Sequence, residues 1–145
     1  CFVGRGTDTA PMILDAIADL GYHLSLDDFG TGHAALSHLR NLPVAEIKID
    51  KEFVSNITVS PQDRAIVAAT AAIAKGMGLR SVAEGVETLD QLHALQQIDT
   101  DVGQGFFWSR ALPPGPFAEF ARTYQPNPDQ TVVPSAPPEP RRGTA

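Results

Sequence analysis

The sequence is poor in cysteine, in basic residues and in long apolar runs, and each shortage excludes a class of protein. One cysteine among 145 residues excludes an internal disulfide and suits a reducing compartment. The 11 Lys and Arg residues against 17 Asp and Glu residues give a formal net charge of −6, so we expect no binding of a nucleic acid polymer through a basic surface. No apolar run approaches the about 20 residues that span a bilayer, so we expect no membrane contact from this segment.

The two ends of the sequence differ from the rest. The first residue is Cys1 without a charged and apolar leader, so we expect a fragment of a longer reading frame, although processing or tag removal leaves a similar end. Six of the 12 prolines lie at or after Pro126, among few large apolar residues. Such a segment buries too little to offset its ordering entropy, which predicts a disordered Pro-rich tail over residues 125–145. A proline-rich docking peptide is the alternative.

Between these ends, helix signals alternate with short strand signals. Ser60 followed by Pro61 is typical of a helix start, and Thr88 with Gln91 forms a capping box. The predicted helices cover residues 9–20, 33–39, 61–77, 89–98 and 114–124, and the predicted strands cover residues 23–26, 46–49, 79–83 and 102–104. Strict alternation predicts an α/β fold with parallel strands and right-handed crossovers. Four such strands fit either a small open sheet or half of a (β/α)8 barrel.

Polar residues mark the ends of the predicted strands. Asp27 and Asp28 close the first strand, and Lys48 lies within the second. Glu84 closes the third strand and Gln104 closes the fourth. Because the carboxyl ends of parallel strands form one rim, we expect these five side chains to converge. Adjacent carboxylates repel unless a cation lies between them, and oxygen ligands favour Mg²⁺ or Mn²⁺, which predicts a metal-dependent site.

Structural roles compete with this interpretation. An Asp-Asp pair before glycine is common turn chemistry, whereas a lysine within an apolar strand is rarely buried without a partner. We expect Asp50, Asp99 and Asp101 to serve as turn or cap residues. Glu87 either orients a loop or faces water. The aromatic residues 106–108 are expected to pack, with stacking on a base as the alternative.

Six segments together resemble the successive motifs of EAL domains. They are Asp27-Asp28-Phe29-Gly30-Thr31-Gly32, Leu42-Pro43-Val44, Ile47-Lys48-Ile49-Asp50, Phe53-Val54, Val82-Ala83-Glu84-Gly85-Val86-Glu87-Thr88 and Gln104-Gly105-Phe106. Their order and spacing also resemble those of the family, and the resemblance covers residues 1–122. It implies that residues 1–124 are the C-terminal half of an EAL domain, the second half of a (β/α)8 TIM-like barrel.

The resemblance implies a cytoplasmic, two-metal phosphodiesterase that hydrolyses cyclic-di-GMP to the linear dinucleotide pGpG. Asp27 would bridge two Mg²⁺ or Mn²⁺ ions, while Asp28 and Glu84 would complete the ligands of the second ion. Lys48 would contact the attacking water or the substrate phosphate, and Gln104 would bind substrate through hydrogen bonds. Glu87 matches a further acidic position with a supporting role. Other segments of the protein would be free to tether it to a membrane.

The sequence also departs from the family pattern. The namesake Glu-Ala-Leu motif, an asparagine and a further glutamate belong to the first half of the barrel and would lie upstream of Cys1. We therefore expect little activity from these residues alone. His33-Ala34-Ala35 replaces the usual Tyr-Ser-Ser of a loop that couples dimerisation to catalysis, and a homodimer is possible.

Two further interpretations stay open. The first is a non-catalytic EAL-type receptor for cyclic-di-GMP, or a protein-interaction module. The second takes Lys48 as a Schiff-base lysine in an aldolase-like barrel.

Overall fold

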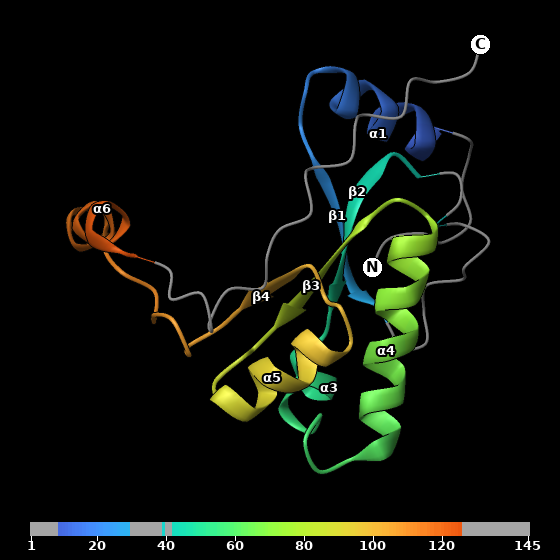
Figure 1. Cartoon of the computed structure of the whole chain (residues 1–145). Coiled ribbons are helices and arrows are strands. Elements are labelled where there is room, and N and C mark those ends of the chain that lie inside the picture. The colour runs from blue at the N-terminus through green and yellow to red at the C-terminus, as the bar shows by residue number, and fades with distance from the viewer. Residues whose placement is uncertain (1–8, 30–38, 40–41, 126–145) are drawn as a thin grey trace.

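The computed structural model describes residues 9–29, 39 and 42–125 of the chain (Figure 1). The helices there are α1 (Thr9–Asp19), α3 (Lys51–Ser55), α4 (Pro61–Gly76), α5 (Leu89–Gln97) and α6 (Pro114–Thr123), and the strands are β1 (Leu24–Phe29), β2 (Val44–Ile49), β3 (Arg80–Glu84) and β4 (Val102–Gln104). Apart from Leu39, the helix predicted over residues 33–39 lies outside the described residues. So do Cys1, Gly30-Thr31-Gly32, His33-Ala34-Ala35 and the tail predicted beyond residue 125.

Side-chain caps and glycines set the helix boundaries, as the sequence predicts. The Ser60 hydroxyl accepts a hydrogen bond from the backbone N–H of Asp63 at the start of α4. The capping box of α5 is present in both directions between Thr88 and Gln91. Gly21 and Gly78 have φ values of +87° and +67°, a conformation that glycine adopts freely, and they follow the ends of α1 and α4.

The four strands form one parallel sheet in the order β1-β2-β3-β4. Each strand therefore lies beside the strand that precedes it in the chain. A doubly wound open sheet reverses its strand order at one point, whereas a (β/α) barrel adds strands in sequence. This order confirms the predicted α/β fold of parallel (β/α) units and agrees with a barrel half.

The two faces of the sheet differ in polarity. On one face, Ile47, Ile49 and Ala83 are fully buried. The helices α3 and α4 pack there, as Figure 1 shows for α4 alongside β2 and β3. Because side chains alternate along a strand, Lys48 and Glu84 lie on the opposite face. In a barrel this second face is the interior, and sites are built where it opens at the carboxyl ends of the strands.

Two apolar clusters hold the helices on the sheet. The larger joins β2, β3, α3, α4 and α5, and its fully buried members are Ile49, Val54, Ile57, Val67, Ala83, Val86, Leu92 and Leu95. The smaller joins β1, β2 and the C-terminal part of α4 through Phe29, Leu39, Ile47, Ala74 and Leu79. Helix α6 has no buried residue and lies apart from the other elements in Figure 1. No helix of the described ranges has the length and apolarity needed to cross a bilayer.

The structure corrects the predicted elements at three points. Strand β1 continues through Asp27 and Asp28 to Phe29, and β3 includes Glu84, so these carboxylates lie within strands instead of after them. Strand β2 begins at Val44, two residues earlier than predicted. Helix α3 was not predicted: Asp50 caps it by accepting from the N–H of Glu52 at 2.7 Å, but a five-residue helix has too little periodicity to be detected.

Helix α5 supplies a matched test of this core, because Leu92 is fully buried and Leu89 is exposed on the same helix. We expect Leu92→Ala to lower the free energy of unfolding by about 2–5 kcal/mol through lost burial and a residual cavity. Leu89→Ala should lower it by less than about 1 kcal/mol. Urea unfolding of both variants measures the difference, and equal losses would contradict the described packing of α5.

Candidate active site

The ammonium group of Lys48 connects three strands at the centre of the candidate site. Its Nζ lies 3.3 Å from Oδ1 of Asp27 on β1 and forms an ion pair with Oε1 of Glu84 on β3. Lys48 and Glu84 are about three-quarters buried, whereas Asp27 is mostly exposed. Three of the five predicted site residues thus converge on the polar face of the sheet.

A bulge in β1 sets the directions of Asp27 and Asp28. Leu26 pairs with Ile47 and Phe29 pairs with Ile49, so β1 uses three steps where β2 uses two. An extra residue of this kind disrupts the alternation of side chains and often occurs beside active sites. Both aspartates are exposed as a result, and Asp28 has a φ of +53°, in the left-handed region that Asp tolerates.

Asp28 lies in a strongly acidic environment. The like charge of Asp27 is the main cause that raises the pKa of Asp28 above its ordinary value, with further contributions from reduced hydration, Asp50 and Glu84. Asp50 was predicted to be a cap or turn residue, and its cap of α3 is confirmed. Its second role, beside Asp28, was not predicted. The available signal was its position directly after β2, at the same strand end as the other acidic residues.

Lys48 is held in its protonated form. The hydrogen bond to Glu84 is the main cause that raises the pKa of Lys48, and Asp27 acts in the same direction, while burial opposes both. A Schiff-base lysine needs a lowered pKa so that its amine is free to attack a carbonyl. The environment of Lys48 therefore disfavours the aldolase-like interpretation.

Glu84 and Gln104 are neighbours across the β3–β4 pair. The segments after these strands are also joined, since Val86 N–H donates to the Gln104 carbonyl at 3.1 Å and Phe107 N–H donates to the Val86 carbonyl at 2.9 Å. Gly105 makes this approach possible, because a Cβ there would overlap the backbone of Val86. Gln104 thus lies at the same edge as Glu84, while the ion pairs of Lys48 within the described ranges are with Asp27 and Glu84.

A buried amide shapes the loop that carries Glu87. The side-chain oxygen of Gln91 accepts from the backbone N–H groups of Glu87 and Thr88 at 2.8 and 3.0 Å. Its side-chain nitrogen donates to the Ser55 carbonyl on α3 at 3.4 Å. The carboxylate of Glu87 is exposed. Gln91 therefore fixes the loop after β3, a role beyond the capping box that the sequence predicts.

A pocket of about 370 Å³ begins at Gln104 and continues to α6. Phe106, Arg110 and Phe117 contribute to its lining, and the Arg110 guanidinium lies 4.6 Å from the centroid of the Phe106 ring. Phe107 and Trp108 pack against the core, as predicted for aromatic residues there. Phe106 is 55% exposed, which leaves its ring accessible to a ligand.

The candidate ligands are of the type that binds a divalent cation, but too few of them lie close together to hold one. The carboxylates Asp27, Asp28 and Glu84 offer the hard oxygen ligands that Mg²⁺ and Mn²⁺ prefer. Within the described ranges, however, no three His, Cys, Asp or Glu side chains lie close enough together to hold a metal ion. Lys48 occupies the position between Asp27 and Glu84. A cation here needs further oxygen ligands from other residues.

Two acidic residues near the start of β4 lie away from this edge. Asp99 has a φ of +65° and forms an exposed ion pair with Lys75, which agrees with its predicted turn role. Asp101 has a contact that was not predicted: its carboxylate accepts from the backbone N–H and the hydroxyl of Ser81 on β3.

Comparison with known proteins identifies the family. The chain matches the EAL domain over residues 5–111. It is 42% identical to the cyclic di-GMP phosphodiesterase NbdA of Pseudomonas aeruginosa over 78% of this chain and 14% of that protein. A solved structure of the PaMucR phosphodiesterase with c-di-GMP superposes with a TM-score of 0.73 and 37% identity, over 78% of this chain and 46% of that one.

A second solved structure bears on metal binding. It is the manganese and cyclic-di-GMP complex of Klebsiella pneumoniae BlrP1, with a TM-score of 0.65 and 39% identity over 71% of this chain and 26% of that one. The chain thus spans less than half of each of these three proteins. Sequence motifs, strand order and structural likeness agree, and the chain belongs to the EAL domain family.

Proposed function

We propose that this chain is the C-terminal half of a metal-dependent phosphodiesterase domain that hydrolyses cyclic-di-GMP to linear pGpG. The observation that supports it most directly is the Lys48 ammonium held between Asp27 and Glu84, on the polar face of a parallel sheet. The relatives named above as cyclic di-GMP phosphodiesterases make this substrate the first to test.

Each residue has a role that its position can perform. Lys48, kept protonated by its two partners, would donate hydrogen bonds to a phosphate oxygen or to the attacking water. Gln104, beside Glu84 and at the mouth of the pocket, would hydrogen-bond the substrate. The exposed face of Phe106 would offer a surface for a guanine base.

Asp27, Asp28 and Glu84 would hold the metal ions, together with carboxylates from the first half of the domain. Bound Mg²⁺ or Mn²⁺ would activate water and neutralise charge at the phosphate. The raised pKa of Asp28 supports this assignment, because a cation would relieve the repulsion by Asp27 that causes it. The supporting role of Glu87, the homodimer and the cytoplasmic location stay predictions.

The decisive experiment measures cyclic-di-GMP hydrolysis with Mg²⁺ or Mn²⁺ in a chain that carries the complete EAL domain. We expect pGpG as product and a large loss of rate in Asp27→Asn and Glu84→Gln. Changes to residues around a metal site typically cost about 10- to 100-fold, and loss of a ligand should cost more. Binding without hydrolysis would instead assign the protein to the receptor class, and absence of both would contradict the proposal.

Lys48 offers a second test against a matched lysine. Replacement by glutamine removes the charge while keeping a hydrogen-bond donor, and we expect kcat to fall about 10²- to 10³-fold. Lys75, whose ion pair with Asp99 lies at the opposite end of the sheet and is about three-quarters exposed, is the control. Lys75→Gln should leave kcat within about twofold of the unchanged protein, since exposed ion pairs contribute little. Equal effects would contradict a direct role for Lys48.

The electrostatics of Asp28 predict a pH dependence. Because the pKa of Asp28 is raised in the metal-free fold, protonation of Asp28 favours that fold at low pH, and this advantage is lost as pH rises through the folded-state pKa. Metal binding requires the carboxylate, so metal affinity should fall on acidification at a higher pH than for an ordinary aspartate. Asp27→Asn should lower the pKa of Asp28, which a carboxyl-detected NMR titration without metal measures. An unchanged pKa would exclude Asp27 as the cause.

A further inference from the structure

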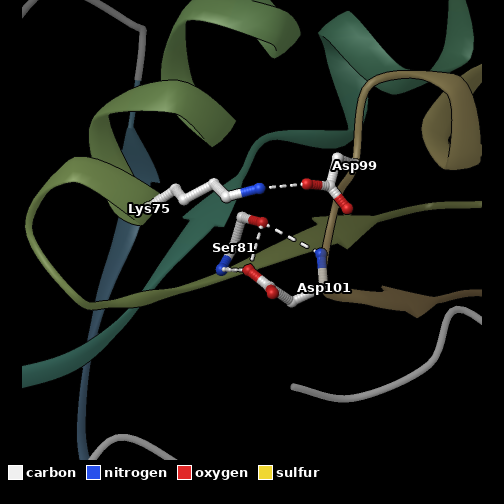
Figure 2. Close-up of polar contacts among 4 residues, drawn as sticks. All are labelled: Lys75, Ser81, Asp99 and Asp101. Atoms are coloured by element: carbon white, nitrogen blue, oxygen red, sulfur yellow. Dashed lines mark hydrogen bonds and ion pairs between the residues drawn. The ribbon is translucent and has the colours of Figure 1, made fainter.

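Ser81 and Asp101 form a reciprocal polar contact at the start of β3 and β4, at the end of the sheet opposite the candidate active site. The Asp101 Oδ2 accepts from both the backbone N–H and the hydroxyl of Ser81, each at 2.8 Å. The Ser81 Oγ in turn accepts from the Asp101 N–H at 3.0 Å. Figure 2 shows the two residues facing each other across neighbouring strands. We call this set of three hydrogen bonds the Ser81–Asp101 clasp.

The clasp takes the place of strand pairing that β4 is too short to provide. Strand β4 has three residues, and its central residue, Gly103, has no side chain to lock the alignment with β3. Its alignment pairs Val82 with Val102 and Glu84 with Gln104. The Asp101 carboxylate accepts from the Ser81 N–H, as the carbonyl of a longer strand would. It thereby fixes the residue that immediately precedes β4.

The alignment matters because of the alternation of side chains along a strand. A slip of β4 by one residue would move Gln104 to the other face of the sheet and away from Glu84. The far end of β4 is held by the hydrogen bond from Val86 N–H to the Gln104 carbonyl. The clasp and this bond enclose the three residues that carry Gln104. Ser81 is fully buried, so its N–H and hydroxyl have no alternative partner in water.

We propose that Ser81 and Asp101 are positioning residues that hold Gln104 beside Glu84 from the opposite end of the strands. The predicted effect on kinetics rests on the proposed function, because it assumes that Gln104 binds substrate. Loss of the clasp would displace Gln104, a substrate contact, more than Glu84, which the β2–β3 pairing and Lys48 also hold. The expected defect is therefore in substrate binding.

The chain provides a matched control in the adjacent ion pair. Asp99 lies two residues before Asp101 and pairs with Lys75 on α4, as Figure 2 also shows. Both partners are about three-quarters exposed. Asp99→Asn removes the charge while retaining a residue type that tolerates the φ of +65° at this position. This variant tests whether the loss of any negative charge near the start of β4 is enough to weaken substrate binding.

The kinetic test compares these variants in the full-length protein with its complete EAL domain. Asp101→Ala should raise the KM for cyclic-di-GMP about tenfold, with a smaller change in kcat, because a buried polar partner is lost and Gln104 is displaced. Asp101→Asn keeps one acceptor oxygen and should recover part of this loss. Adding Ser81→Ala to Asp101→Ala should cost little more, since both act through one contact. Asp99→Asn should match the unchanged protein.

A lower kcat at unchanged KM, accompanied by a lower Tm, would overturn the proposal, because it would indicate a smaller folded fraction instead of a displaced Gln104. So would an equal rise in KM for Asp99→Asn. Either result would leave a stabilising contact with no specific effect on the site.

Hydrogen exchange at the Val86 amide tests the clasp without any assay of activity. This amide donates to the Gln104 carbonyl, so it reports the alignment of β4 directly. By NMR, Asp101→Ala should speed its exchange at least about tenfold relative to amides of the β2–β3 pair, and Asp99→Asn should not. If the Val86 amide exchanged at the same rate in Asp101→Ala, the proposed positioning role of the clasp would be wrong, even if the enzyme were active. If the unchanged protein neither binds nor hydrolyses cyclic-di-GMP, the proposed function fails, while the exchange result still decides the clasp.

Discussion

The site depends on one cation, the ammonium group of Lys48, which holds carboxylates from the two neighbouring strands. A lysine that is three-quarters buried loses much of its hydration, and only close anionic partners offset that loss. Those partners, Asp27 and Glu84, belong to strands that flank β2 on either side. The position of β2 between β1 and β3 therefore does more than define the fold, because an order without it would separate Lys48 from one of its two anions.

A second polar layer on the same face supports this arrangement. One step closer to the start of the strands, the Glu46 carboxylate pairs with Arg80 at 2.8 Å and accepts from the Ser25 hydroxyl. These residues again come from β1, β2 and β3, and Glu46 is aligned with both of the others. The Arg80 Nε is buried without a partner among the described residues. A buried donor of this kind requires an acceptor. The polar face is thus built to meet further residues, whereas α3 and α4 already pack on the apolar face.

The successful sequence predictions rest on local signals, whereas features that depend on contacts between distant segments were missed. The caps at Ser60 and Thr88 and the alternation of helix and strand were sufficient to predict four parallel strands and the α/β class, although the short helix α3 was missed. The strand-end rule brought Asp27, Lys48 and Glu84 together correctly, because every parallel strand presents its carboxyl end at one edge. The β1 bulge and the Ser81–Asp101 clasp could not be predicted, since each depends on the alignment of two strands that are distant in sequence.

The excess of negative charge at the carboxyl-end edge of the sheet bears directly on the proposed function. Asp28 is affected by the carboxylates of Asp27, Asp50 and Glu84, two of which, Asp27 and Glu84, share a single lysine, and the whole chain is acidic. One ammonium cannot neutralise this group, and the raised pKa of Asp28 is the measurable sign of the excess. A phosphodiester is itself an anion, so the edge as it stands would repel it. Only added positive charge reverses the local field, and oxygen donors without nitrogen or sulfur ligands select hard divalent cations for that purpose. The same excess of carboxylates that makes the metal-free edge unfavourable is therefore what would make it bind a metal and, through the metal, a phosphate.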